Sequence, residues 1–127
     1  MTKAEYEHEL SDFYGTQAYH ATASEDVVLT DGAKFLRDNG LKEVIRAIVS
    51  AQPHVQTKSR PMRTFQVWNL TKTDDGWTLL GGTGAKRGKP VFERRFEALP
   101  DFPLDQIQIY VGFNGPYKAV VLLPSEH

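Results

Sequence analysis

The chain has 127 residues, of which 40% are hydrophobic and 24% charged, with a formal net charge of -1 and no cysteine. These values are typical of one soluble globular domain, and they exclude disulfide cross-links, thiolate metal sites and cysteine nucleophiles. No apolar run approaches the roughly 20 residues of a membrane span, and the acidic start lacks the apolar core of a signal peptide. We therefore expect a single domain over residues 1–127, located in the cytoplasm and without membrane contact.

The start of the chain predicts a helix followed by a short strand. Tyr6, Leu10 and Phe13 recur at helical spacing behind acidic residues that suit a helix N-terminus. A loop of small residues follows, and Val27–Leu29 then predicts a short strand.

Two further helices are expected before the middle of the chain. Thr30 or Asp31 offers an oxygen that caps a short helix, and Asn39-Gly40 is a suitable left-handed end for it. Leu41–Val49 then has apolar residues at positions i, i+3, i+4, i+7 and i+8, with charged residues on the opposite side. We expect Pro53 to end this helix.

The second half of the chain predicts antiparallel strands separated by turn residues such as Asp74-Asp75-Gly76. Helices followed by a strand meander indicate an α+β fold, with the N-terminal helices packed on one face of an antiparallel sheet of about 4–5 strands. The expected strands cover residues 64–71, 77–82, 91–98, 106–113 and 117–123.

Two of these strands are apolar on both faces. Ala119–Leu123 is a run of five apolar residues, and Trp68 and Leu70 point away from Phe65 and Val67. One explanation is a central strand with a bulge, covered by other parts of the same chain. The alternative is a subunit interface, in which case the protein is a homodimer through Trp68 and Leu70.

Charge is distributed in three blocks. Residues 58–95 carry a net charge of +6, between flanks of -4 and -3. If the basic residues share one face, they form a binding surface for phosphates or other anions. If they lie in solvated loops, they pair instead with the acidic flanks. The candidate binding residues are Arg60, Arg63, Lys86, Arg87 and Lys89.

The glycine-rich segment from Gly81 to Pro90 is expected to be a hairpin. Its spacing does not match a phosphate-binding loop, because Thr83 and Pro90 stand where that motif needs a glycine and a Ser or Thr. If its basic side chains bind an anion, they then do so by charge and not through a phosphate-binding loop.

No pattern of catalytic or metal-binding residues is present. His8, His20, His54 and His127 lack the spacing of paired metal ligands. We interpret Asp31 and Asp101 as residues that accept hydrogen bonds from nearby backbone N–H groups. A small hydrolase, the alternative, needs a pocket in which these aspartates or a histidine converge.

The C-terminal Ser125-Glu126-His127 contains the residue types of a hydrolase triad, but adjacent residues on a tail do not aim at one another as a triad does. We expect a structural role, in which Pro124 ends the last strand and Glu126 anchors the tail to a backbone N–H or a basic side chain.

Several motifs resemble a family of small bacterial and phage-encoded proteins of unknown function. The resemblance extends from about Leu10 to His127, and one departure is the absence of tryptophan from Leu41–Val49. The motifs that carry it are Leu29–Gly32, Phe65–Leu70, Asp101–Leu104 and Leu122–Glu126.

The resemblance implies a non-enzymatic binding protein of phage or mobile-element type. By analogy with small proteins in that setting, we expect an inhibitor of host defence, of the anti-CRISPR kind, that binds a host protein or sequesters a nucleotide. The alternative is a nucleic-acid-binding protein that uses residues 58–95. In either case we expect no catalytic residues, no cofactor and no metal.

Overall fold

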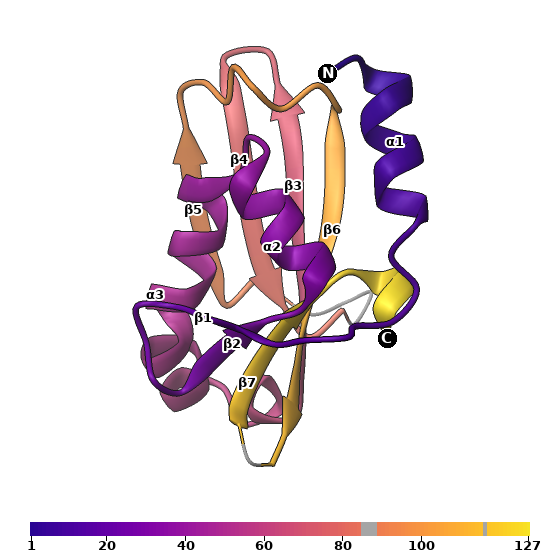
Figure 1. Ribbon diagram of the computed structural model, residues 1–127. Helices are drawn as coiled ribbons and strands as arrows, with labels where there is room; N and C mark the ends of the chain where they lie inside the picture. Colours follow the sequence, from indigo (N-terminus) through magenta and orange to yellow (C-terminus); the bar gives the residue numbers. More distant parts are fainter. Residues whose placement is uncertain (85–88, 116) are drawn as a thin grey trace.

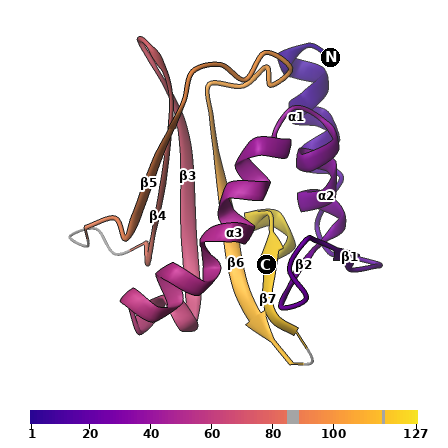
Figure 2. The ribbon, with the colours of Figure 1, turned by 90° about the vertical axis from the view of Figure 1, so that its left-hand side faces the viewer.

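The structure is a computed structural model that describes residues 1–84, 89–115 and 117–127. Its described residues form one mixed sheet in the order β1-β2-β7-β6-β3-β4-β5. The helices α2 and α3 lie against one face of the sheet, whereas α1 stands beside it (Figures 1 and 2). The expected α+β class is thus confirmed.

The bounds of the elements follow the expectations closely in the second half of the chain. The helices are α1 (Lys3–Ser11), α2 (Asp31–Asp38) and α3 (Lys42–Lys58), with the short 3-10 turns η1 (Pro61–Arg63) and η2 (Pro124–Glu126). The strands are β1 (His20–Ala21), β2 (Val27–Leu29), β3 (Phe65–Thr73), β4 (Gly76–Gly82), β5 (Phe92–Phe96), β6 (Gln106–Asn114) and β7 (Tyr117–Leu122).

The sheet has seven strands among the described residues, more than the four or five expected. β2 is the short strand expected at Val27–Leu29, outside the meander, and β1 was not expected. β2 pairs in parallel with β7 over Val27–Leu29. Strands of two and three residues carry too little periodicity to predict their pairing.

The ends of α2 are as the sequence indicates. Thr30 is the N-cap, and its hydroxyl accepts the N–H of Ala33 at 3.3 Å. After Asn39, Gly40 has a φ of +107°, a backbone conformation that side-chain-bearing residues rarely adopt. These two points fix the direction in which the chain enters α3.

The expected end of α3 at Pro53 is wrong, because the helix continues to Lys58. A proline inside a helix removes one backbone hydrogen bond and its ring crowds the preceding turn. Pro53 lies on the exposed side of α3, where the freed carbonyl can be hydrated. Beyond it, Val55 is fully buried in the core. This burial holds the last turn against the sheet.

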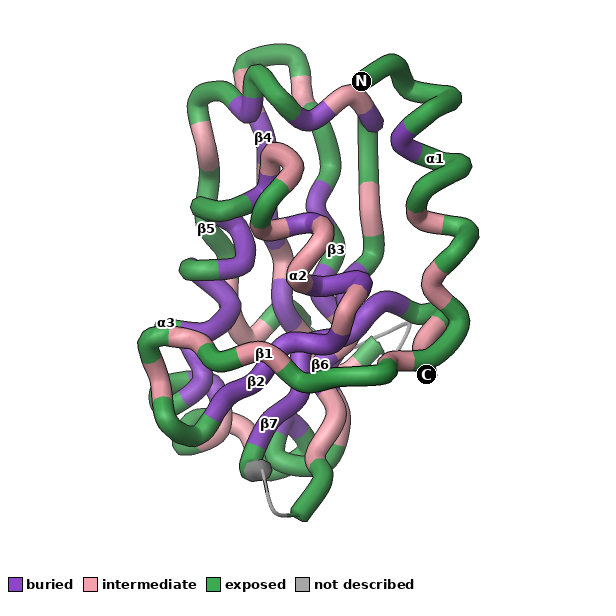
Figure 3. Tube along the Cα trace, viewed as in Figure 1, coloured by how far each residue is buried: buried purple, intermediate pink, exposed green. Residues whose placement is uncertain are grey.

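The main core lies between α3 and the central strands. Trp68 and Leu70 of β3 point into it and are both 0% exposed (Figure 3 shows the buried strands behind α2 and α3). The prediction that these two side chains form a subunit interface is therefore wrong. The helices of the same chain already cover them.

The apolar strand β7 is central, between β2 and β6, and the neighbouring β6 has a bulge between Gly112 and Asn114. Every residue of Ala119–Leu123 is buried within the single chain. The explanation by a covered central strand is confirmed at this position.

A buried amide pair joins α3 to β3. The side chains of Gln52 and Gln66 exchange two hydrogen bonds, at 2.9 and 2.8 Å, and the indole N–H of Trp68 donates to Gln66 Oε1 at 2.8 Å. Gln66 also donates to the Met62 carbonyl at 2.8 Å. These bonds satisfy polar groups that would be costly to leave unpaired in the core.

Candidate functional site

The site with the most suggestive chemistry is a pocket of about 370 Å³ between α2, α3 and the loop that joins β1 to β2. We call it the cationic pocket, because three basic side chains lie around an apolar base. Its lining residues are Thr22, Ala23, Ser24, Leu29, Arg37, Lys42, Ile45, Arg46, Val49 and Ser50.

The base and the rim of the cationic pocket come from one stretch of α3. Ile45 and Val49 supply apolar surface, and Lys42 and Arg46 stand one turn apart beside them. Neither of these two cations makes an ion pair or a side-chain hydrogen bond with any part of the chain that the structure describes. Two positive charges are thus left next to an apolar surface.

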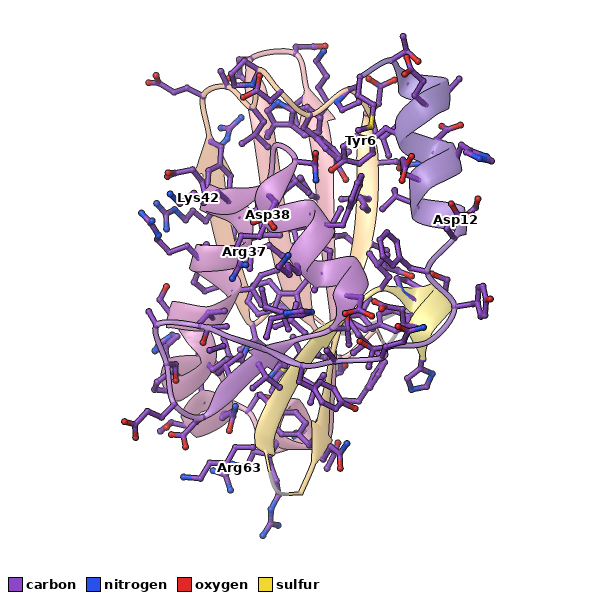
Figure 4. All side chains as sticks on the ribbon, in the orientation of Figure 1. Tyr6, Asp12, Arg37, Asp38, Lys42 and Arg63 are labelled. Carbon is purple, nitrogen blue, oxygen red and sulfur yellow. The ribbon has the colours of Figure 1, made fainter. Side chains whose placement is uncertain are left out.

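The third cation, Arg37, is held in place by its own chain. Its Nε donates to Asp38 Oδ1 at 3.2 Å and its Nη1 to the Ala21 carbonyl at 3.4 Å. Burial opposes the ionisation of Asp38, but the bonds and charges of Arg37 and Lys34 lower the pKa of that carboxyl overall. Figure 4 shows Arg37, Asp38 and Lys42 on the same side of the molecule.

The loop wall of the pocket is fixed by a single hydroxyl. Thr22 Oγ1 lies 2.9 Å from the Ser24 carbonyl and 2.8 Å from the Val27 carbonyl, and it accepts the Ser24 N–H at 3.0 Å. A wall ordered in this way is present before a ligand arrives, which reduces the entropy cost of binding.

The basic residues expected to bind anions lie elsewhere. Arg60 and Arg63 are exposed in and beside η1, and Arg63 Nε donates to the Gln56 carbonyl at 2.6 Å. Lys89 is exposed beside the end of β4. Lys86 and Arg87 lie outside the described residues.

Asp31 and His20 do converge. His20 Nε2 lies 2.8 Å from Asp31 Oδ1, and the Gln17 N–H donates to Asp31 Oδ2 at 2.9 Å. These hydrogen bonds lower the pKa of the Asp31 carboxyl, and the bond from Gln17 has a larger effect than the bond from His20. The pair ties the chain before β1 to the start of α2. Asp31 does accept a backbone N–H, but the donor is Gln17, which is distant in the sequence and not the neighbouring residue that was expected.

The remaining residues that a hydrolase site would need do not lie near Asp31 and His20. Asp101 lies against Gly40, at the opposite end of α2 from Asp31. Among the described residues no hydroxyl or other nucleophile is hydrogen-bonded to His20, and no three potential metal ligands form a group. His8 and His54 are exposed on α1 and α3.

The C-terminal turn has the structural role expected of it. Glu126 accepts the Thr30 hydroxyl at 2.6 Å and the Gly32 N–H at 3.0 Å, so two of the resembling motifs meet at the start of α2. His127 points elsewhere, with its ring 5.1 Å from that of Phe65. The three C-terminal residues are therefore not a triad.

The sequence did not reveal the cationic pocket, because Lys42 and Arg46 have the spacing of an ordinary solvated helix face. The missing information is the position of the loop after β1, which turns that face into the wall of a pocket. The one signal in the sequence is the pair of like charges, Lys42 and Arg46, at positions i and i+4 of the expected helix.

Among the described residues no helix is long and apolar enough to cross a bilayer. Neither the curated proteins nor the solved structures include a significant match to the chain. Residues 4–127 match a protein family described as "Family of unknown function (DUF6876)". Because the match covers nearly the whole chain, the protein belongs to this family.

Proposed function

We propose that this chain is a non-enzymatic binding protein that holds a nucleotide in the cationic pocket. The observation that carries the proposal is the pair of cations, Lys42 and Arg46, which have no ion-pair partner among the described residues and stand beside the apolar surface of Ile45 and Val49. A nucleotide has matching parts, since its phosphates are anionic and its base is flat and largely apolar on its faces.

The electrostatics of the pocket favour an anion. Like charges at i and i+4 on a helix destabilise it by about 0.2–0.5 kcal/mol, and Arg37 adds a third positive charge at the same opening. A phosphate between Lys42 and Arg46 removes this repulsion and forms charge-assisted hydrogen bonds. Asp38 offsets part of the charge of Arg37, so the two α3 cations make the larger contribution.

The biological setting comes from the sequence resemblance. In a phage or mobile element, a small protein of this kind acts by removing a nucleotide signal from a host defence system, and thus as an inhibitor of that system. Direct binding of a host defence protein is the other form that such inhibition takes.

The test is calorimetric titration with ATP and with a cyclic dinucleotide, cyclic di-AMP, at low salt. We expect the wild-type protein to bind at least one of them and the K42A/R46A double variant to bind at least tenfold more weakly. The matched control is R63A, which removes one exposed cation that does not line the pocket. Absence of heat with both ligands at millimolar concentration contradicts the proposal.

A second candidate is binding of nucleic acid through the basic segment. The observation that favours it is the register of the sheet, in which Val67 near the start of β3 pairs with Gly82 at the end of β4. Arg60, Arg63 and Lys89 therefore lie at one end of the sheet. Here R60E/R63E is expected to weaken binding of any DNA or RNA alike, with a steep dependence on salt, whereas K42A/R46A leaves it unchanged.

A further inference from the structure

The strand β5 lies at one edge of the sheet, at the opposite side from the two-residue strand β1. It pairs with β4 on one side, and no described strand lies on the other (Figures 1 and 2). An unpaired edge of this kind exposes backbone N–H and C=O groups that another strand can bind. The edge is short, and its three central residues, Glu93, Arg94 and Arg95, are all exposed.

The side chains of β5 alternate between the two faces of the sheet. Phe92, Arg94 and Phe96 lie opposite Gly81, Leu79 and Trp77, so they point to the face that carries the helices. Glu93 and Arg95 lie opposite Leu80 and Thr78 and point to the open face. The five residues thus form a near-symmetric pattern, with an aromatic residue at each end and opposite charges on either side of the centre.

We propose that β5 pairs with β5 of a second copy of this chain, antiparallel and about a two-fold axis at Arg94. In this register Phe92 lies opposite Phe96 of the partner, and Glu93 lies opposite the partner's Arg95. Two cross-strand ion pairs and two aromatic pairs result, and the two sheets become one continuous sheet.

The neighbouring registers lack this complementarity. A two-fold axis perpendicular to the sheet keeps the helix-bearing faces of both copies on the same side. Such an axis must pass beside a residue that pairs with its own copy, so the neighbouring registers are those centred on Glu93 and on Arg95. Centred on Arg95, the pairing sets Glu93 opposite Glu97 and Arg95 opposite itself. Centred on Glu93, it sets Glu93 opposite itself. The charges therefore select the register at Arg94.

The two Arg94 side chains, which carry like charges at the two-fold axis, point away from each other. The Arg94 guanidinium lies over the ring of its own Phe96, 5.1 Å from the ring centroid, which turns it along the strand and away from the axis. On the open face, Glu93 has no ion-pair partner among the described residues. Arg95 is hydrogen-bonded to Asp75 at 2.9 Å and remains 60% exposed, so it is accessible to a second carboxylate.

A strand of five residues buries little area, which places this interface in the class of weak, reversible dimers. The two-fold pairing leaves the cationic pocket free, because no residue of β5 lines it. Dimerisation and ligand binding are therefore independent properties that separate experiments measure.

The first test is disulfide trapping, which the absence of native cysteine makes clean. Opposite residues in an antiparallel pair have Cα atoms about 4.5–5.5 Å apart, within reach of a disulfide, so oxidised R94C forms a covalent dimer. In the same register the two copies of residue 95 lie roughly 8 Å apart, so R95C does not. S125C, an exposed residue on the C-terminal turn, measures the background of random collisions.

The second test is a charge exchange followed by sedimentation velocity over a range of concentrations. Each of E93R and R95E sets like charges opposite each other, and dimerisation is expected to weaken at least tenfold. The double variant E93R/R95E restores the opposite pairs and with them the dimer. A wild-type protein that is monomeric up to about 500 µM, R94C that cross-links no faster than S125C, or a double variant that stays monomeric would each overturn the proposal.

Discussion

At the scale of single residues, the Gln52–Gln66 pair decides how α3 sits on the sheet. Both amides are almost fully buried, and their bonds reach the Trp68 indole and two backbone carbonyls. A glutamine in an apolar core is tolerated only where its donors and acceptors are all used, and among the described residues no buried side-chain polar atom lacks a partner. The network therefore fixes one register of the helix against β3.

The first prediction concerns this network. The substitution Gln66→Leu removes the acceptor of the buried Trp68 N–H, whereas Gln52 keeps its bonds to the Ile48 carbonyl and to Gln56. The unpaired indole N–H should lower the free energy of unfolding by about 1–3 kcal/mol. Urea unfolding followed by tryptophan fluorescence measures the change. The control is Gln108→Leu, an exposed amide that bonds Asn69 at 3.1 Å, for which a change within about 0.5 kcal/mol is expected. Equal losses in both variants would contradict this account.

Single residues were also where the sequence was least informative about function. Whether Lys42 and Arg46 face solvent or a pocket depends on a loop that is distant in the sequence, and Asp31 meets His20 only because β1 lies beside β2. A helical period or a turn signal reports on neighbours along the chain. It does not report on which segments meet in space.

At the scale of elements, the C-terminal turn η2 is fastened to the start of α2. The Glu126 carboxylate accepts three hydrogen bonds, from the Thr30 hydroxyl and from the N–H groups of Gly32 and Leu123. A carboxylate at a helix N-terminus is also favoured by the helix dipole. The contact requires a glycine, because a Cβ on Gly32 would lie 2.5 Å from Glu126 Oε1.

The second prediction follows from this close approach. Gly32→Ala should destabilise the protein by about 1–3 kcal/mol, although alanine is the better helix former by up to about 1 kcal/mol. Thermal unfolding measures the loss. Gly15→Ala is the matched control, since a Cβ there meets nothing within 4 Å. If Gly32→Ala is as stable as the wild type, the close contact with η2 does not constrain α2.

Most of the elements themselves could be predicted from the sequence. The caps of α2, the turn before β4 and the five longer strands follow from local patterns, and each occurs within a few residues of its expected bounds. Pro53 is the instructive exception, because the burial of Val55 outweighs a single missing hydrogen bond. Tertiary packing decided that boundary.

At the scale of the whole molecule, the chain divides into a dense core and a lightly attached first helix. The sheet, α2 and α3 share one apolar cluster, whereas α1 buries only Tyr6 and is exposed along nearly all of its length (Figure 3). Thr2 and Glu5 form a capping box that stabilises the first turn locally. The position of α1 beside the sheet therefore depends mainly on Tyr6, with Leu10 partly buried against the same core.

The last prediction tests that dependence. The Tyr6 ring packs 5.3 Å from Phe35 and 5.4 Å from Phe102, and its hydroxyl donates to the Asn39 carbonyl at 2.8 Å. Tyr6→Ala should release α1, so that its amides lose protection against hydrogen exchange. Those of β3 and β6 should remain protected.

The variant Tyr6→Phe keeps the ring and loses only the hydrogen bond, so it should destabilise by about 1 kcal/mol and leave α1 in place. The substitution separates the two contributions because phenylalanine keeps the ring that contacts Phe35 and Phe102 and lacks the hydroxyl that bonds Asn39. If Tyr6→Ala leaves the exchange of the α1 amides unchanged, the capping box alone maintains the helix. If it unfolds the whole chain instead, α1 belongs to the cooperative core.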